Sequence, residues 1–215
     1  RSFGHTRSIL VTLRARPALT FRRDHLPPSR RAEHNMGMPA TESRHWTPED
    51  VRQLMRESES HWPRYELIDG ELLMTPAPGM SHYRALIGLF ELVRPYALHE
   101  GVGEACLSPA DLELRKQTIS QPDLFVAPRE QVRTFKRWQD VTGVTLCVEV
   151  LSPGSAAYDR GRKRVHYQKS GIAEYWIVDN EARLIERWRP GDQRPEIIRD
   201  QLVWHPAGAA APLTI

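Results

Sequence analysis

Residues 147–153 read CVEVLSP, and the acid in this stretch, Glu149, raises the question of what the surrounding chain is built for. Residues 145–151 place apolar and β-branched side chains on both sides of this acid, which is typical of a strand covered on both faces. An unpaired carboxylate buried in such a strand costs several kcal/mol. We therefore expect Glu149 to be protonated, paired with a basic side chain, or bound to a metal ion.

Length and composition indicate one globular domain. The chain has 215 residues, of which 40% are hydrophobic and 27% are charged, and this length suffices for one full core. No stretch approaches the roughly 18 apolar residues of a membrane span. The two cysteines, Cys106 and Cys147, match no disulfide or zinc spacing, and Cys147 is expected to be a small core residue. These features predict a cytoplasmic protein that is not integral to a membrane.

The first 40 residues differ from the rest of the chain. They contain eight arginines against Asp24 and Glu33, so the remaining 175 residues carry a net charge of −3 although the whole chain carries +3. Residues 1–40 also lack a sustained apolar period. We expect them to be a disordered or non-native extension ahead of a domain at residues 41–215, with an arginine-rich targeting peptide as the alternative.

Helices and a hairpin are predicted before the acidic strand. Thr47 followed by proline and two acids predicts a helix to about Glu57. Two β-prone runs around Asp69-Gly70 predict a hairpin. Apolar residues at helical spacing after a capping Ser81 predict a helix that weakens at Pro95 and stops by Gly101.

The second half of the chain alternates strands with one helix. A helix is predicted over residues 157–170, with Gly171 placed to end it. The predicted strands are 111–114, 123–126, the strand of Glu149, a hairpin of 174–178 with 183–188, and short edge strands at 197–198 and 202–204. This order predicts a mixed α/β sheet flanked by helices in a single domain.

Chemically useful side chains gather around Glu149 in this scheme. Asp123 follows a proline at the mouth of an apolar strand, and Asp159, Lys163 and Tyr167 share one face of the helix that follows Glu149. If the strands of Asp123 and Glu149 are neighbours, their carboxylates repel unless one is protonated or a cation lies between them. Oxygen ligands suit Mg²⁺, which makes a bound water more acidic. Lys163 would then offset charge on a phosphate in the transition state.

Six motifs occur in an order that resembles a known family. YELIDGEL, the PxP turn followed by His82, QPDLFV, VEVLSP, DRGRKRVHY and GIAEYWIVD resemble the Uma2-type endonucleases of the PD-(D/E)XK nuclease superfamily over about residues 45–190. Pro122-Asp123 and Glu149 look like the two acidic half-motifs. The usual lysine two places after the second acid is absent, because position 151 is leucine, and Lys163 looks like its relocated equivalent. Glu66 matches an acid beside the same site.

The resemblance implies a restriction-endonuclease-like fold and a metal-dependent DNA endonuclease. It implies catalytic roles for Asp123, Glu149, Lys163 and Glu66, with the three acids binding Mg²⁺ or alternatively Mn²⁺. DNA is the expected partner, and a homodimer stays open. Further substrate contacts are predicted for His82 at a helix start and for Arg160 and Arg164 on a basic helix face.

Each assignment has a simpler alternative. Asp123 could cap a strand, Glu149 could form a buried salt bridge with an arginine, and Lys163 could be solvated. Glu66 could pair with Arg64, and His82 could be a surface or capping residue. The corresponding alternative function is an inactive nucleic-acid-binding or interaction module with a nuclease fold. An RNA nuclease or phosphodiesterase on the same scaffold also stays open.

Overall fold

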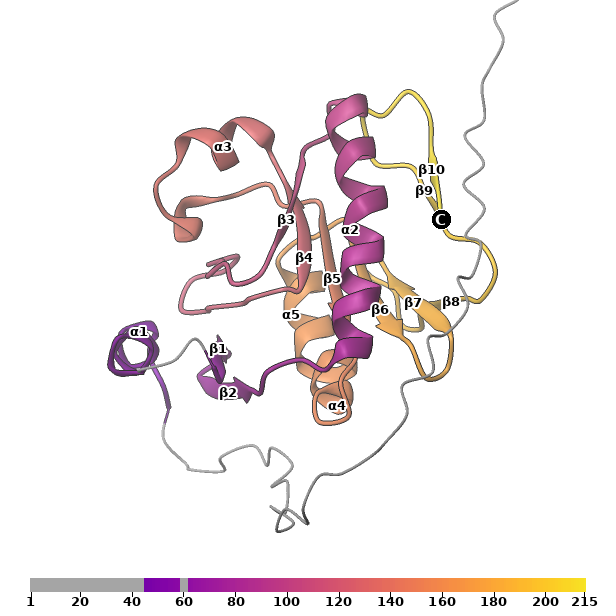
Figure 1. Ribbon diagram of the computed structural model, residues 1–215. Coiled ribbons are helices and arrows are strands. Elements are labelled where there is room, and N and C mark those ends of the chain that lie inside the picture. The colour runs from indigo at the N-terminus through magenta and orange to yellow at the C-terminus, as the bar shows by residue number, and fades with distance from the viewer. Residues whose placement is uncertain (1–44, 59–61) are drawn as a thin grey trace, which may run out of the picture.

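A six-stranded sheet forms the centre of the protein in a computed structural model that describes residues 45–58 and 62–215 (Figure 1). The sheet has the order β3-β4-β5-β6-β7-β8. Its strands are β3 (Glu104–Leu107), β4 (Leu124–Ala127), β5 (Leu146–Val150), β6 (Glu174–Asp179), β7 (Leu184–Trp188) and β8 (Glu196–Ile198). The predicted extension at residues 1–40 lies outside the described residues.

The strand directions make this sheet mixed. Neighbouring strands are antiparallel throughout, except that β5 and β6 run parallel. A parallel pair needs a crossover connection, and the helical segment between β5 and β6 supplies it. That segment consists of α4 (Ala156–Tyr158), a π-helical turn η2 (Asp159–Lys163) and α5 (Arg164–Lys169). The predicted mixed α/β fold is therefore confirmed.

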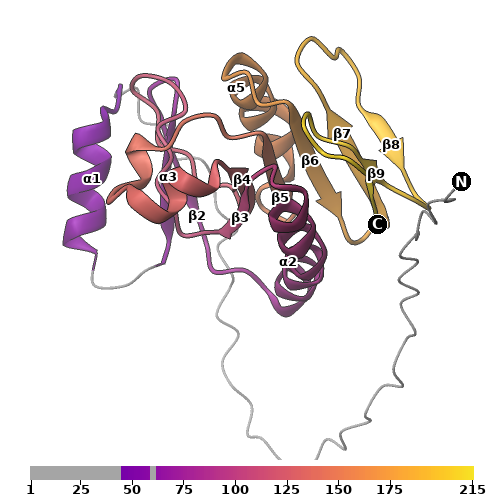
Figure 2. The ribbon, with the colours of Figure 1, turned by 90° about the horizontal axis from the view of Figure 1, so that it is seen from above.

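Helices cover both faces of the sheet. Helix α2 (Met80–Glu100) lies across one face, and α5 lies on the opposite face (Figures 1 and 2). Alternation along β5 follows from the pleat: Val148 packs in the core beneath α2, whereas Cys147 packs in the core beneath α5. Glu149 has the parity of Cys147, so its side chain belongs to the α5 face.

A separate hairpin brings Glu66 toward this sheet. Strands β1 (Arg64–Ile68) and β2 (Glu71–Thr75) pair around Asp69-Gly70 as predicted, and α1 (Pro48–Glu57) begins at a Thr47 capping box. Leu67 bridges to Ile119 through backbone hydrogen bonds. This bridge ties the hairpin to the segment that leads into β4.

Some element boundaries differ from the predictions. Residues 111–114 form no strand, because Leu112 makes only one bridge, to Ser120. Strand β3 was not predicted, since its four residues show no alternation. Gly79 occupies the N-cap of α2 in place of Ser81, and α2 continues through Pro95 to Glu100.

The remaining short elements lie outside the central sheet or at its border. Strand β8 is an edge strand as predicted, whereas β9 pairs with β10 in a separate two-stranded sheet. These elements are α3 (Arg129–Thr134), the 3₁₀ turn η1 (Trp138–Asp140), β9 (Val203–Trp204) and β10 (Leu213–Thr214). No helix in the described part of the chain is long and apolar enough to cross a membrane.

The α5 face contains a histidine that should make the fold sensitive to acid. His166 is fully buried, and neither ring nitrogen has a hydrogen-bond partner among the described residues. Burial, together with the nearby positive charges of Arg115 and Lys163, lowers its pKa from 6.5 to about 4, although Asp69 opposes the shift. The folded protein therefore keeps the ring neutral at pH values where the unfolded chain binds a proton.

We expect His166 to lower the free energy of unfolding as pH falls from its unfolded pKa to its folded pKa of about 4. The loss should total roughly 3 kcal/mol, because one unit of pKa shift corresponds to about 1.4 kcal/mol. His166→Phe keeps a ring of similar size and cannot take up the proton. Urea unfolding of both proteins between pH 7 and pH 4 measures the difference. Equal acid sensitivity of the two proteins would contradict the assignment.

Candidate active site

Asp123 and Glu149 come together because their strands pair. Leu124 lies opposite Val148 in the antiparallel ladder between β4 and β5, so Asp123, one residue earlier, lies beside Glu149, one residue later. The backbone N–H of Val150 donates to Asp123 Oδ2 at 3.0 Å. The two strands are therefore neighbours, which is the condition under which the sequence predicts that the two carboxylates meet.

Asp123 is held by two cationic or hydrogen-donating side chains. Arg64 Nη2 donates to Oδ1 at 2.9 Å, and His82 Nε2 lies 2.8 Å from Oδ2. Burial favours the neutral acid, but His82, Arg64 and the N–H of Val150 outweigh it and lower the pKa of Asp123 to about 2. Asp123 is therefore a fixed anion, and both of its oxygens already accept hydrogen bonds.

Glu149 has a different environment. Its Oε1 accepts from Lys163 Nζ and from the Tyr167 hydroxyl, each at 2.9 Å, and Oε2 accepts no hydrogen bond from the described residues. Burial raises its pKa well above the usual value, and Asp123 and other acids add to the shift while Lys163 opposes it. The base that pairs with Glu149 is thus a lysine, where the salt-bridge alternative expected an arginine.

Lys163 lies at the centre of the cluster and not in solvent. Its Nζ lies 2.8 Å from Glu66 Oε2 and 3.8 Å from Asp159 Oδ1, in addition to its bond to Glu149. Glu66 Oε1 in turn accepts from the backbone N–H of Gln121 at 2.8 Å. Glu66 therefore pairs with Lys163 and not with Arg64. These acids outweigh the desolvation of the ammonium and raise the pKa of Lys163 well above its usual value.

The cluster holds more negative than positive charge. Its four carboxylates and Lys163 are each at most 3% exposed, and Arg64 supplies the second fixed cation. Two negative charges stay uncompensated if all four acids ionise and His82 is neutral. Burial accordingly raises the pKa of Asp159 to about 6, against the effect of Lys163. Two protons or one divalent cation would balance the charge. The four acids are Glu66, Asp123, Glu149 and Asp159.

A small cavity opens among these side chains. Its volume is about 10 Å³, which is space for about one water-sized particle. Arg64, His82, Asp123, Glu149, Asp159 and Lys163 are among its lining residues. The cavity is thus large enough for an ion but not for a nucleotide.

The donor set fits a divalent cation in kind and charge. Carboxylate oxygens are the ligands that Mg²⁺ prefers, and Mg²⁺ is usually bound through only one or two of them, with waters and substrate phosphates completing the shell. Within residues 45–58 and 62–215, no three His, Cys, Asp or Glu side chains are arranged as a ready-made metal cage.

The three residues predicted to contact substrate, His82, Arg160 and Arg164, lie in different parts of the structure. His82 is buried against Asp123 and lines the cavity, so it is neither a surface nor a capping residue. Arg160 forms ion pairs with Asp179 and Glu186 at 2.8 and 2.6 Å. Arg164 stacks over Trp188 with 4.8 Å between its guanidinium carbon and the ring centroid.

Arg160 and Arg164 do not line the cavity. Their role as substrate contacts stays a prediction without support from the geometry.

Arg64 and Asp159 belong to the site but were not predicted as functional residues. The sequence suggests Arg64 only as a partner for Glu66, and it places Asp159 near Glu149 without a catalytic or metal-binding role. A signal for Asp159 was available, because it shares a helix face with Lys163. The sequence offered no comparable signal for Arg64, since its contact with Asp123 spans 59 positions of the chain.

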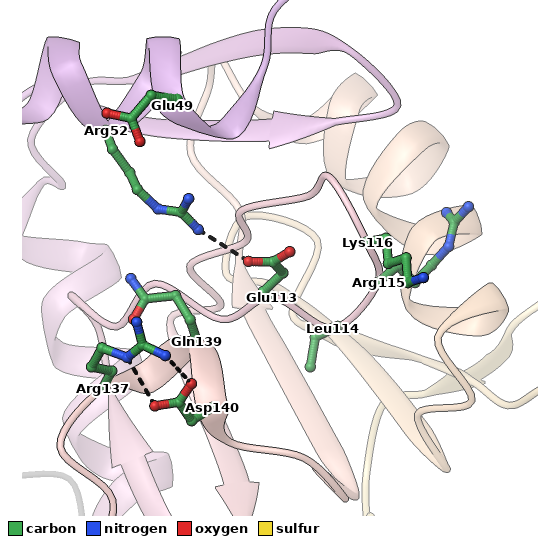
Figure 3. A pocket seen from close by; sticks show the side chains of 9 residues that line it. All are labelled: Glu49, Arg52, Glu113, Leu114, Arg115, Lys116, Arg137, Gln139 and Asp140. Carbon is green, nitrogen blue, oxygen red and sulfur yellow. Dashed lines mark hydrogen bonds and ion pairs between the residues drawn. The ribbon is translucent and has the colours of Figure 1, made fainter.

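A larger cavity lies away from this cluster, between α1, residues 113–116 and residues 137–140 (Figure 3). Its volume is about 770 Å³. Arg52 pairs with Glu113, and Arg137 pairs with Asp140, at distances of 3.0 and 2.6 Å. The charged side chains that line this larger cavity largely neutralise one another at the surface. The larger cavity therefore lacks the uncompensated buried charge of the acidic cluster.

The mixed sheet, helices on both faces and an acid–lysine cluster beside two paired strands define a nuclease-like α/β fold of the restriction-endonuclease type. Residues 48–209 match the Uma2 family, described as "Putative restriction endonuclease". The chain belongs to this family.

Two proteins of a cyanobacterium are similar to this chain over part of its length. The uncharacterized proteins slr1290 and sll1609 of Synechocystis sp. are 28% and 24% identical over 135 and 145 residues. These alignments cover 60% and 66% of this chain, and 67% and 81% of the relatives.

A crystal structure of a "putative nuclease belonging to DUF820" from Anabaena variabilis superposes with a TM-score of 0.58. Its identity to this chain is 18%, and the match covers 74% of this chain and 90% of the other. This likeness concerns the fold. Family and fold together indicate a nuclease.

Proposed function

We propose that this protein is a divalent-metal-dependent endonuclease that hydrolyses phosphodiester bonds in DNA. The observation that carries the proposal is the buried cluster of four carboxylates and two fixed cations, in which three of the carboxylates and both cations line a cavity the size of one ion. Burying uncompensated charge costs stability. A cluster that served only to hold the fold together would gain by pairing every charge.

The residues of the chain divide the work in this proposal. Glu149 has a free carboxylate oxygen and would bind the metal. Arg64 and His82 hold Asp123 as an anion at the same cavity. Glu66 and Glu149 together fix the ammonium of Lys163, where it can offset negative charge that develops on a phosphate. A bound divalent cation would supply Lewis acidity toward water and phosphate oxygens.

Arg64 is the group best placed to receive the substrate. Its guanidinium lines the cavity, uses one amino group on Asp123, and has a buried Nε with no partner among the described residues. Guanidinium donors match phosphate oxygens in geometry and charge. We infer that a backbone phosphate approaches the cavity from the side of Arg64.

Purified protein should convert supercoiled plasmid DNA to nicked and linear forms with Mg²⁺ or Mn²⁺, and EDTA should stop the reaction. Gel electrophoresis of a time course measures this. A Glu149→Gln protein prepared in the same way controls for a contaminating nuclease. Cleavage of RNA in place of DNA would move the proposal to an RNA nuclease. Absence of cleavage of either nucleic acid at saturating metal would overturn it in favour of an inactive module.

A further inference from the structure

An exposed and uncharged segment forms one side of the small cavity. Residues 76–79 connect β2 to α2 (Figure 1), and this connection lines the cavity together with His82. Every residue from 76 to 81 is exposed, and residues 72–83 contain no aspartate, glutamate, lysine or arginine. We call residues 76–83 the rim segment. A phosphodiester that enters the cavity passes along this segment, because the acids and the ammonium inside are at most 3% exposed.

Two large side chains of the rim segment lie outside the core. Met80 is 65% and Tyr83 is 54% exposed, the two highest values for large apolar side chains in the described part of the chain. They lie three positions apart at the start of α2, so they share one face of the helix. Farther along α2, Leu86 and Phe90 pack against the core. Burial in the core therefore accounts for the later apolar residues of α2 but not for Met80 and Tyr83.

Charged and apolar groups alternate around the cavity entrance. Arg64 and Lys163 line the cavity, the rim segment follows, and Arg84, the next residue after it, is exposed. A nucleotide strand has the same alternation, since each phosphate carries a charge and each base has two uncharged ring faces on which an aromatic side chain can stack. The rim segment lacks the cations that follow a phosphate backbone. Its position beside the cavity therefore matches a base.

We propose that Tyr83 stacks on an unpaired base of the DNA substrate, next to the phosphate that enters the cavity, and that Met80 packs against the same base. The inference rests on the proposed function. Bases of an intact duplex are stacked on their neighbours and offer no free ring face. The site should therefore prefer DNA with unpaired bases at the cut. A second copy of the chain is the less suitable occupant, because a protein bound to the rim segment would cover the cavity.

Binding of fluorescein-labelled DNA, followed by fluorescence anisotropy, tests the inference without cleavage. The ligands are a mixed-sequence single strand and the duplex of the same sequence, each measured in EDTA and again with Ca²⁺, which also takes oxygen ligands. Wild type should bind the single strand more tightly. Tyr83→Ala should weaken this binding about 5- to 100-fold, the effect of losing one stacked base, and should affect duplex binding much less.

Three controls accompany this measurement. Tyr83→Phe keeps the ring and should bind the single strand within about twofold of wild type, because stacking needs only the π-face. Phe135→Ala removes an exposed aromatic side chain that does not line the cavity, and it should bind as wild type does. Tyr83→Ala should melt at the wild-type temperature, because the Tyr83 ring is largely exposed.

The possible outcomes separate this inference from the proposed function. Wild-type affinity of Tyr83→Ala for the single strand, an equal loss for single strand and duplex, or the same loss in Phe135→Ala overturns base stacking and leaves the proposed endonuclease intact. A wild-type dimer that Tyr83→Ala converts to monomers in sedimentation also overturns it, and assigns the rim segment to an interface between two copies. Absence of DNA binding by wild type in both buffers overturns both proposals. Binding that depends on Tyr83, without cleavage in Mg²⁺, overturns the endonuclease alone.

Discussion

Replacing Lys163 by methionine is expected to lower the free energy of unfolding by about 3–5 kcal/mol at neutral pH, the range seen when one partner of a buried ion pair is removed. The ammonium is the only cation within 4 Å of Glu66, Glu149 and Asp159 among the described residues. Methionine keeps most of the packing volume but leaves three carboxylates facing one another. Urea unfolding, followed by circular dichroism, measures the change.

Lys169→Met is the matched control for this experiment. Lys169 ends α5, the helix that directly follows the turn of Lys163, and is exposed, so its loss should change stability by less than about 0.5 kcal/mol. If Lys163→Met changes stability no more than this control, the ammonium does not compensate the buried acids. The proposed charge balance of the site would then be wrong.

The loss caused by Lys163→Met should depend on pH. Burial already raises the pKa of Asp159 to about 6 with Lys163 in place, and removing the ammonium raises it further. A carboxyl whose pKa is higher in the folded state stabilises the fold at low pH and loses this contribution as pH rises. The deficit of the variant should therefore be largest at neutral pH and above, and should shrink on acidification.

The sequence indicated that Asp123 and Glu149 belong to one cluster, because both acids can be recognised from their immediate neighbours in the chain. Asp123 and Glu149 are each an acid in or next to an apolar strand. Burying such an acid costs free energy, so a partner or a function is expected for it. The hairpin around Asp69-Gly70 was predictable because both turn residues tolerate positive φ, and they have φ values of 50° and 82°.

The partners of each acid were not predictable, because they are set by tertiary contacts. A solvated Lys163 and a Glu66–Arg64 pair were both reasonable for isolated segments. In the folded protein the hairpin of β1 and β2 contacts residues 119–121. As a result Glu66 pairs with Lys163 and not with Arg64, and Arg64 pairs with Asp123. The π-helical turn escaped prediction for a related reason, since local spacing does not distinguish it from an ordinary helical turn.

Replacing Glu149 by glutamine should abolish metal-dependent behaviour without weakening the fold. Glutamine can still accept hydrogen bonds from Lys163 and Tyr167 through its one oxygen, and Lys163 keeps Glu66 at 2.8 Å. The variant also removes one negative charge from a cluster that has an excess of two when all four acids are ionised and His82 is neutral. In EDTA it should therefore be at least as stable as wild type, while cleavage should fall by at least about a hundredfold, the scale of one lost electrostatic contribution.

Added Mg²⁺ should raise the melting temperature of wild type more than that of Glu149→Gln. Metal that binds the folded state alone stabilises it by about 2.7 kcal/mol at a hundredfold excess over the dissociation constant, so wild type should melt at a higher temperature with Mg²⁺ than with EDTA. Glu149→Gln should gain little. Glu91→Gln, the same chemical change at an exposed position of α2, should respond to Mg²⁺ as wild type does.

A different result is expected if Glu149 has only a structural role. If Glu149 serves only as the ion-pair partner of Lys163, its neutralisation should cost about 3–5 kcal/mol whether or not metal is present, and wild type should melt at the same temperature with Mg²⁺ and with EDTA. Melting curves of the two proteins under both conditions distinguish a metal ligand from a structural ion pair. The first pattern would answer the question raised by an acid in an apolar strand, because it would show that Glu149 binds a divalent cation there.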